Sequence, residues 1–460
     1  MRRAAANTGG FFGINSDLGP VIAVGTSQMT LALAGLALYL FCVHSFKLPL
    51  ASVGIAIGVL GVLTNPKGLT VPAPFLLMSA FLGWCALAAA NSQFKGTVGP
   101  WLIDYLKILL IFFVALNASK TISQLAVFVG LWVLMFGLFP ARGTYFNFLA
   151  GINQFGRYGW NFSFANYNDL AAYTILCMAL SAFLLVSKFP KWVRRGALIS
   201  TAGLALMVII TQSRGAFLAT VIAFFFMLLR SRSRTKLIKF GCLAALGITM
   251  LAPGAVWERF SRMKYLFNTD TLGEADTSAQ QRYVLLQIAT TIAKENMVTG
   301  VGLGAYTEAH GMYAEERQEW QFGRGNRDAH NMYVNLAAET GIPGLLVFLG
   351  MLGSVLLRAL RTEKALRGRF PIEAEQLRIL RFGLVAYMIA GIFGSFHRVS
   401  FLWLYLAVVW TAATLFEEMA ATSHPGVPMP GPMPQPSPLR GGWRGSIPRR
   451  GRGTMVPTTR

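Results

Sequence analysis

The chain has few charged residues, and acidic ones are the scarcest. Charged side chains make up 13% of its 460 residues, with 19 aspartates and glutamates against 41 lysines and arginines. A soluble domain usually carries about a quarter charged residues, whereas 54% of this chain is hydrophobic. Repeated apolar runs of about 20 residues accompany this deficit. These features favour a polytopic helical membrane protein over the alternative, a large soluble protein with buried helices.

Cysteine is also rare, and the usual metal-binding patterns are missing. Each cysteine lies in an apolar run, and no two of them share the spacing of metal ligands. They therefore favour small core residues over a disulfide framework or a zinc site. The polar segments contain neither a DxD nor an HExxH pattern, so we expect no metal site and no cofactor. The four cysteines are Cys42, Cys85, Cys177 and Cys242.

The apolar runs predict an all-α integral membrane protein with about twelve transmembrane helices. A cleaved signal peptide is not expected, because no small-residue cleavage site follows a short apolar core after Met1. The expected spans are 21–44, 48–64, 71–90, 99–117, 122–140, 168–188, 196–212, 214–230, 237–256, 338–358, 378–396 and 400–417.

Lysines and arginines gather in short loops after the sixth, eighth and tenth spans, which twelve crossings place on one side. The positive-inside rule assigns that side, with both termini, to the cytoplasm. The opposite side is then periplasmic and receives the longest polar segment. The expected organisation is transmembrane helices 1–9 in 1–256, a periplasmic loop in 257–333, helices 10–12 in 334–418, and a basic cytoplasmic tail in 419–460.

The long polar segment contains a predicted amphipathic helix. Leu285, Ile288, Ala289 and Ile292 fall at helical spacing, which predicts a helix over about 278–295 with one apolar face. We expect it to lie on the outer membrane surface and roof a cavity. The GVGLGAY sequence that follows predicts a turn, and it is no nucleotide-binding loop because no strand precedes it.

The tail, 419–460, is rich in proline, glycine and arginine. It lacks the apolar content needed to order a fold, so we expect it to be disordered. The net charge of the whole chain is +22. A basic tail beside a membrane favours contact with anionic lipid head groups, with nucleic-acid binding as the alternative.

Two arginines stand out on the expected periplasmic side. Arg214 lies between two apolar spans with almost no loop, where a charge is costly and contrary to the positive-inside rule. An anionic ligand is the simplest explanation, and the alternative is a tight hairpin whose arginine reaches the head groups. Arg282 begins the amphipathic helix, where a cation opposes the helix dipole; a plain surface role is its alternative.

His330 lies just before the chain returns to apolar sequence, and it follows Arg324 and Arg327. A neutral imidazole can take a proton from an attacking hydroxyl, and the arginine fork suits phosphate oxygens. Taken alone, a histidine in a polar loop is more often structural. His330 is therefore the candidate catalytic residue, with Arg327 and Asn331 beside it as candidate substrate contacts.

Four stretches in this order resemble the superfamily of O-antigen ligases and polymerases, which are polytopic bacterial membrane proteins. The likeness covers residues 160–350 best. It departs from the common pattern at Tyr167 and Ala329, where many members have proline. The stretches are FANYNDLAAY at 164–173, TQSRGAF at 211–217, SAQQRYVLLQIA at 278–289 followed by GVGLGAY, and AHNMYVNLAAETGIPGLL at 329–346.

The resemblance implies transfer of a glycan from a polyprenyl diphosphate carrier to an acceptor hydroxyl at the periplasmic face of the inner membrane. The reaction is taken to be inverting and metal-independent. By motif position, Arg214 and Arg282 match the arginines proposed to bind the donor diphosphate, and His330 matches the proposed catalytic histidine. Asn168, in the first stretch, is a further candidate substrate contact. The implied partners are the lipid-linked donor, a glycan, lipid or protein acceptor, and membrane lipids, with no nucleic acid.

Two other functions remain open from the sequence. Within the family, the protein could be a polysaccharide polymerase, for O-antigen or exopolysaccharide, or a protein O-oligosaccharyltransferase, and only the acceptor distinguishes these. Outside it, a transporter of polysaccharide or lipid-linked precursor is the alternative. Transporters more often show internal repeats and ionisable residues near the membrane midplane, and the nearest approach here is Asp104 and Lys107.

Overall fold

The computed structural model describes most of the chain. The described residues are 29–45, 48–64, 68–154, 156–160, 164, 166–230, 235, 238–239, 241–242, 277–316 and 318–423. The expected tail beyond Ser423, the start of the expected loop at 257–276 and the start of the first expected span lie outside them.

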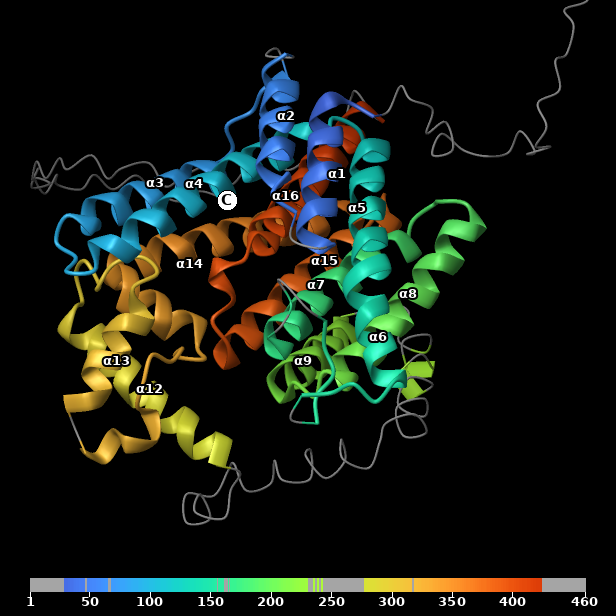
Figure 1. The fold of residues 1–460 in the computed structure, drawn as a ribbon. Helices are drawn as coiled ribbons and strands as arrows, with labels where there is room; N and C mark the ends of the chain where they lie inside the picture. The colour runs from blue at the N-terminus through green and yellow to red at the C-terminus, as the bar shows by residue number, and fades with distance from the viewer. Residues whose placement is uncertain are drawn as a thin grey trace, which may run out of the picture.

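Within these residues every named element is a helix (Figure 1). The all-α prediction is therefore confirmed for the described part of the chain. The α-helices are α1 Leu31–His44, α2 Ala51–Leu63, α3 Ala73–Ala89, α4 Lys95–Ala118, α5 Ile122–Phe136, α6 Arg142–Leu149, α7 Tyr167–Leu185, α8 Lys191–Ile210, α9 Arg214–Arg230, α12 Thr277–Glu295, α13 Tyr306–Glu316, α14 Met332–Leu366, α15 Pro371–Ala390 and α16 Ser400–Thr422. Shorter helical turns are η3 Gly137–Ala141, η7 Gln318–Gly323, η8 Gly391–Phe393 and η9 Phe396–Arg398.

Seven helical segments of the described chain are long and apolar enough to cross a membrane, and four more are apolar but shorter. Together they coincide with eleven of the twelve expected spans. The remaining span, 237–256, has only residues 238–239 and 241–242 described, so the count of twelve stays a prediction. The seven long segments are Lys95–Ala118, Ile122–Leu149, Tyr167–Leu185, Lys191–Ile210, Met332–Leu366, Pro371–Phe393 and Ser400–Thr422.

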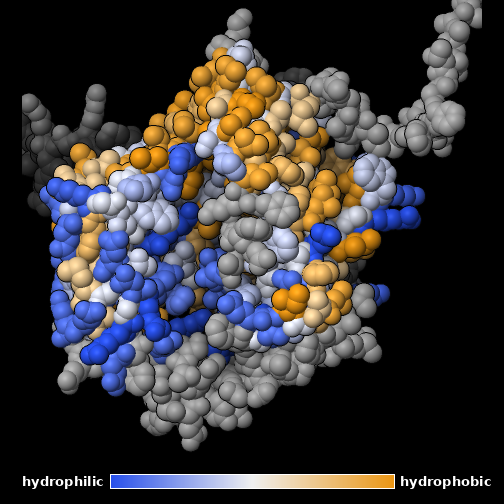
Figure 2. Space-filling model, viewed as in Figure 1, coloured by the Kyte–Doolittle hydropathy of each residue, from blue (hydrophilic) through white to orange (hydrophobic). Residues whose placement is uncertain are grey.

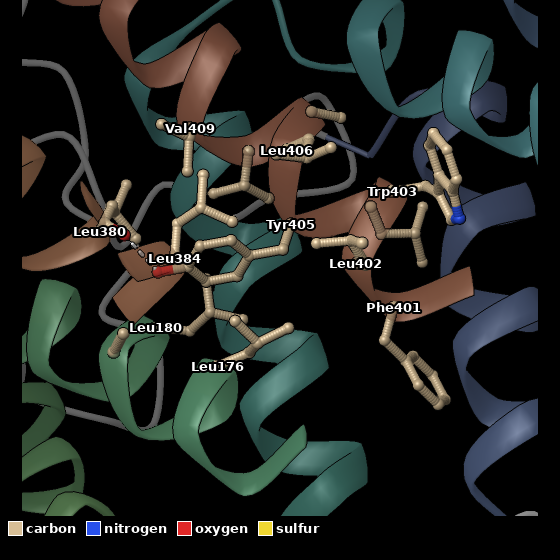
Figure 3. Packing of buried hydrophobic residues seen from close by; sticks show 14 of the residues in the cluster. Leu176, Leu180, Leu380, Leu384, Phe401, Leu402, Trp403, Tyr405, Leu406 and Val409 are labelled. Atoms are coloured by element: carbon tan, nitrogen blue, oxygen red, sulfur yellow. Dashed lines mark hydrogen bonds between the residues drawn. The ribbon is translucent and has the colours of Figure 1, made fainter. Parts of the chain in front are cut away.

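The core is built around α16, the most deeply buried of the seven long spans. Figure 3 shows Tyr405 of α16 among leucines of α7 and α15, with its hydroxyl donating to the Leu380 carbonyl over 2.8 Å. Leu402, Trp403 and Leu406 are completely buried. A span that is mostly covered by other helices makes little contact with lipid. Helix α16 therefore provides a rigid support for the segments at its ends.

The polar end of the molecule has a small core of its own. The predicted apolar face of α12 is confirmed, because Leu285, Ile288, Ala289 and Ile292 are all buried. Ile288 and Ile292 pack with residues of α13 and with Trp320 of η7. Figure 1 shows α12 and α13 together at one end of α14, and Figure 2 shows hydrophilic surface over this region against hydrophobic surface over α1 and α2. The described part of the expected periplasmic segment, from residue 277 onward, is therefore a folded cap on the helix bundle.

Helix α14 begins earlier than expected and is broken near its start. Its first residue is Met332 rather than 338, and Gly341 interrupts it with φ 68° and ψ 179°, a conformation open mainly to glycine. A side chain there would also collide with the carbonyl of Val298 in the turn after α12. The amide of Ile342 instead donates to the Met297 carbonyl over 2.7 Å. This break joins the polar cap to the membrane-spanning part of α14.

Candidate functional site

His330 sits in a short turn between the polar cap and α14. Its backbone has φ +49°, a left-handed conformation that few residues other than glycine adopt. The turn is fixed on both sides, because Ala329 is buried in the cap core and the side-chain oxygen of Asn331 caps α14, accepting from the amides of Tyr333 and Val334 over 3.0 and 3.1 Å. Strained backbone held in place by its neighbours is common at functional sites.

Asp328 is the acidic group nearest to this histidine. Its Oδ2 lies 4.0 Å from Nδ1 of His330, while its Oδ1 accepts a hydrogen bond of 2.8 Å from the side chain of Asn335. Both His330 and Asp328 are about one-third exposed, at 31% and 32%. The imidazole can therefore be reached from outside, and Nδ1 faces a negative charge.

The surroundings keep His330 neutral. Burial lowers the pKa of His330, the charges of Arg282, Arg157 and Arg327 lower it further, and only Asp328 raises it. The net result is a pKa below the ordinary value for histidine. A histidine that is neutral at neutral pH can accept a proton, which is the first requirement of a general base.

Arg157 is a member of this site that the sequence analysis did not single out. Its guanidinium donates to Asn168 Oδ1 over 2.8 Å and to the Thr211 carbonyl over 3.0 Å, and it lies 4.9 Å from the centre of the Tyr167 ring. These contacts join two of the four sequence stretches that resemble the family, and the charge of Arg157 also reaches His330. No local sequence signal marks it, because its partners lie in other segments.

Arg214 is the first residue of α9 and follows a three-residue turn, as the near-absence of a loop predicts. Gln212 in that turn has φ +53°. The hydroxyl of Ser213 donates to Asn168 Oδ1 over 3.1 Å, the atom that Arg157 also contacts. Asn168 therefore connects the start of α7 with the start of α9, and its candidate role as a substrate contact stays a prediction.

The structure brings some of the candidate residues together. Arg282 on α12 and Arg327 both act electrostatically on His330, so α12 and the His330 turn contribute to one electropositive region. Arg282 is half-buried, whereas Arg327 is exposed and donates to the Arg324 carbonyl over 2.9 Å. Asn331 has a structural role as the cap of α14, and its contact with substrate stays a prediction. Within the described residues, no group of three or more histidine, cysteine or acidic side chains could hold a metal ion.

Residues 199–349 match the model of the O-antigen ligase family. This match supports a relationship of the chain to the O-antigen ligase superfamily. The match runs from α8 to the first part of α14 and contains Arg214, Arg282, Arg327, His330 and Asn331. No curated protein matches the chain. The match confirms the resemblance found from the sequence, and the family it names suggests a membrane glycan transferase of the ligase or polymerase type.

The region that matches the O-antigen ligase family does not contain every residue at the site. Asn168 and Arg157 lie before the matched region, and Arg398, described below, lies after it. Arg398 follows the eleventh expected span on the expected periplasmic side, so the positive-inside argument that singled out Arg214 could also have found it. Arg398 was not singled out because it lies directly after the end of an expected span.

Proposed function

We propose that the protein transfers a glycan from a polyprenyl diphosphate carrier to an acceptor hydroxyl at the periplasmic face of the bacterial inner membrane. The observation that carries this proposal is the setting of His330. Burial and three arginines lower the pKa of a solvent-accessible imidazole, which lies inside the region that matches the O-antigen ligase family. A neutral base within an electropositive region suits a reaction between a hydroxyl and an anionic leaving group.

His330 is the proposed general base. Since Nδ1 faces Asp328, Nε2 is the nitrogen that takes the proton from the acceptor hydroxyl. The acceptor oxygen then forms a bond to the anomeric carbon, and the bond from that carbon to the diphosphate oxygen breaks. The electron pair leaves with the diphosphate, so attack from the opposite face inverts the anomeric configuration. The carboxylate of Asp328 stabilises the resulting imidazolium.

Arg214 and Arg282 are the proposed partners of the diphosphate. Negative charge builds up on the leaving group as the glycosidic bond breaks, and cations already in place stabilise it without reorganisation. The guanidinium fork matches phosphate oxygens in geometry. In this reaction the two arginines supply the positive charge, and transfer is independent of added metal. The lipid part of the donor explains why such a site lies at the end of a membrane-helix bundle.

The test is a reconstituted assay with purified protein in vesicles of inner-membrane lipid composition. Polyprenyl diphosphate glycan is supplied with a lipid A core acceptor, with a second lipid-linked glycan, or with an acceptor protein, each with and without a chelator. The proposal expects release of polyprenyl diphosphate and an inverted linkage on one acceptor, unaffected by the chelator. The acceptor used distinguishes a ligase from a polymerase and from a protein O-oligosaccharyltransferase.

Two outcomes would overturn the proposal. The first is movement of the lipid-linked glycan across the vesicle membrane without release of polyprenyl diphosphate, which would indicate a transporter. The second is transfer that stops when the chelator is added and returns with a divalent cation, which would assign the leaving-group charge to a metal rather than to the arginines.

A further inference from the structure

A buried ion pair lies next to the site, between residues far apart in sequence. Glu339, on the first part of α14, is completely buried, and the guanidinium of Arg398 donates to its Oε1. Arg398 comes from η9, between α15 and α16, and its side chain is 18% exposed. The neighbouring His397 places Nε2 at 3.5 Å from Glu339 Oε2. Burying such charges is costly unless their geometry is well defined.

Four segments hold this ion pair in place. The Arg398 guanidinium lies 5.2 Å from the centre of the Trp101 ring of α4, a cation–π distance. The glycine-rich turn after α12 packs on the other side, where the amide of Gly302 donates to the Glu339 carbonyl over 3.0 Å. The amide of Gly304 faces the Glu339 carboxylate, and a side chain at Gly304 would collide with Trp101. The glycines of GVGLGAY thus allow the backbone to approach a buried carboxylate.

Asn335 links the ion pair to the turn that carries His330. It is completely buried and lies one helical turn before Glu339. Its Oδ1 accepts from the Arg398 guanidinium over 3.3 Å, and its Nδ2 donates to Asp328 Oδ1 over 2.8 Å. The other oxygen of Asp328 is the one that faces His330 Nδ1. A continuous series of polar contacts therefore runs from η9 through α14 to the turn.

We propose that Arg398 is a positioning residue: its ion pair with Glu339 orients the Asn335 amide, which holds Asp328 and so fixes the His330 turn in its reactive geometry. This inference rests on the proposed function in assigning the reaction to His330. Arg398 touches neither reacting group in this scheme. It acts through two side chains, and it connects the last two spans to the site.

The contacts determine which way the Asn335 amide points. Arg398 has only donors, so it selects the oxygen of Asn335, and the amide nitrogen is then directed at Asp328. Without Arg398 the amide can reverse and present its oxygen to a carboxylate, which repels it. The Asp328 side chain would then leave its place, and the strained backbone at His330 would lose one of its supports.

The central test is Asn335→Leu, which keeps the branched shape and the number of side-chain heavy atoms, removes the amide, and leaves both partners of the Glu339–Arg398 ion pair in place. We expect kcat for glycan transfer to fall by about 10- to 100-fold, since small displacements of a catalytic group have effects of that size. The KM for the lipid-linked donor should stay within about twofold, because no donor contact is removed. Arg398→Gln should give the same kcat loss, and Arg398→Lys should restore part of it.

A double-mutant cycle shows whether the effect passes through Asp328. If it does, Asn335→Leu combined with Asp328→Asn should be no slower than the slower single variant, because one contact cannot be lost twice. Multiplying effects would overturn the proposal. So would wild-type kcat in Asn335→Leu, or an Arg398→Gln variant that changes only the KM for the donor, as expected if Arg398 bound the diphosphate itself.

Arg381→Gln is the matched control for loss of a largely buried arginine, because the Arg381 side chain is 12% exposed and that of Arg398 is 18% exposed. Arg381 also pairs with a fully buried glutamate, Glu363, and lies 4.6 Å from the centre of an aromatic ring, Phe382. It has no contact with the His330 turn among the interactions described for it. We expect Arg381→Gln to lower the thermal midpoint as Arg398→Gln does, without the loss of kcat in the protein that remains folded.

Hydrogen exchange tests the positioning role of Arg398 without relying on the reaction assigned to His330. Backbone amides of 328–334 should exchange at least tenfold faster in Asn335→Leu than in the unchanged protein, and those of α15 should not change. If the unchanged protein transfers no glycan, the proposed function fails, and the exchange result still decides the positioning role. Unchanged exchange at 328–334 would overturn the inference whatever the activity.

Discussion

Helix α14 carries a fully buried glutamate near each end, and the two are held very differently. Glu363 accepts hydrogen bonds from Arg367, Arg378 and Arg381, at 2.6, 3.0 and 2.7 Å. Glu339 has one arginine, and its Oε2 has no hydrogen-bond partner among the described residues. The two positions are 24 residues apart, or about 36 Å along a helix, which is close to the thickness of a membrane core.

The comparison shows how a structural ion cluster differs from one beside a reactive group. At Glu363 three arginines satisfy both carboxylate oxygens, so the cluster holds α14 against α15 and little else is required of it. At Glu339 the polar groups are incompletely paired, and the backbone nearby is left-handed at His330, Gly304 and Gly341. Incomplete pairing and strain together are typical of functional sites rather than of stable cores.

The largest expected difference between the two ends comes from the arginines at the Glu339 end. Arg214→Gln and Arg282→Gln should each lower kcat/KM for the lipid-linked donor by about 100-fold or more, the usual loss when a group that stabilises leaving-group charge is removed. Arg367→Gln, at the Glu363 end, is the control and should leave kcat/KM within about twofold in the folded protein. An equal loss of kcat/KM in Arg367→Gln would show that the Glu339 and Glu363 ends of α14 do not differ in function.

The two glutamates themselves give the next effect. Glu363→Gln should destabilise the protein by about 3–5 kcal/mol, because three arginines, of which Arg378 is buried, lose their counter-charge, and kcat of the folded protein should not change. Glu339→Gln should lower kcat about tenfold, since the Asn335 amide loses its fixed arginine partner. Thermal unfolding in detergent and transfer assays on the same samples separate the two. A Glu363→Gln variant with reduced kcat would contradict the comparison.

The pH dependence of transfer should shift in opposite directions for two neighbours of His330. As a general base His330 acts when neutral, so activity falls on the acidic side of its pKa. Asp328 raises that pKa and Arg327 lowers it. Asp328→Asn should therefore move the acidic limb of the pH–rate profile to lower pH, and Arg327→Gln should move it to higher pH. Profiles of kcat in vesicles are the measurement, and shifts of the same sign would exclude His330 as the titrating base.

The smallest expected effect belongs to the pair of Lys188 with Glu373, at 2.8 Å. The lysine side chain is 66% exposed, so solvent screens the charge and the pair contributes less than about 1 kcal/mol. Lys188→Ala should leave both the thermal midpoint and the transfer rate nearly unchanged. A large loss of stability or of transfer rate would mean that the contribution of an ion pair in this protein depends on its charge alone and not on its burial.

Patterns of residues along the chain predicted much of the architecture. Within the described residues, hydropathy predicted eleven helices in their observed places, with limits several residues off for α14 and α15, and the spacing of four apolar residues predicted the buried face of α12. The start of α14 was missed by six residues because Asn335 and Glu339 face other protein segments rather than lipid, which leaves no hydropathy signal. The break at Gly341 depends on the turn that packs against it and is likewise invisible locally.

The sequence predicted a site residue only where the charge or type of that residue is unusual for its neighbours in the sequence. Arg214 was found because a cation there violates the positive-inside rule, and His330 because arginines precede it. Arg157 and Asn335 have ordinary local sequences, and their importance arises from contacts with other segments, such as Arg157 with Thr211 and Asn335 with Arg398. Tertiary contacts of this kind can be identified only from the three-dimensional structure.

The most direct test of the account is the transfer rate of His330→Ala. Reconstituted protein would be supplied with polyprenyl diphosphate glycan and the best acceptor, and insertion and thermal midpoint would be measured on the same sample. The account predicts a fall in kcat of about 100- to 10,000-fold with insertion unchanged. Transfer at the wild-type rate by His330→Ala would remove His330 from the reaction and contradict the central claim.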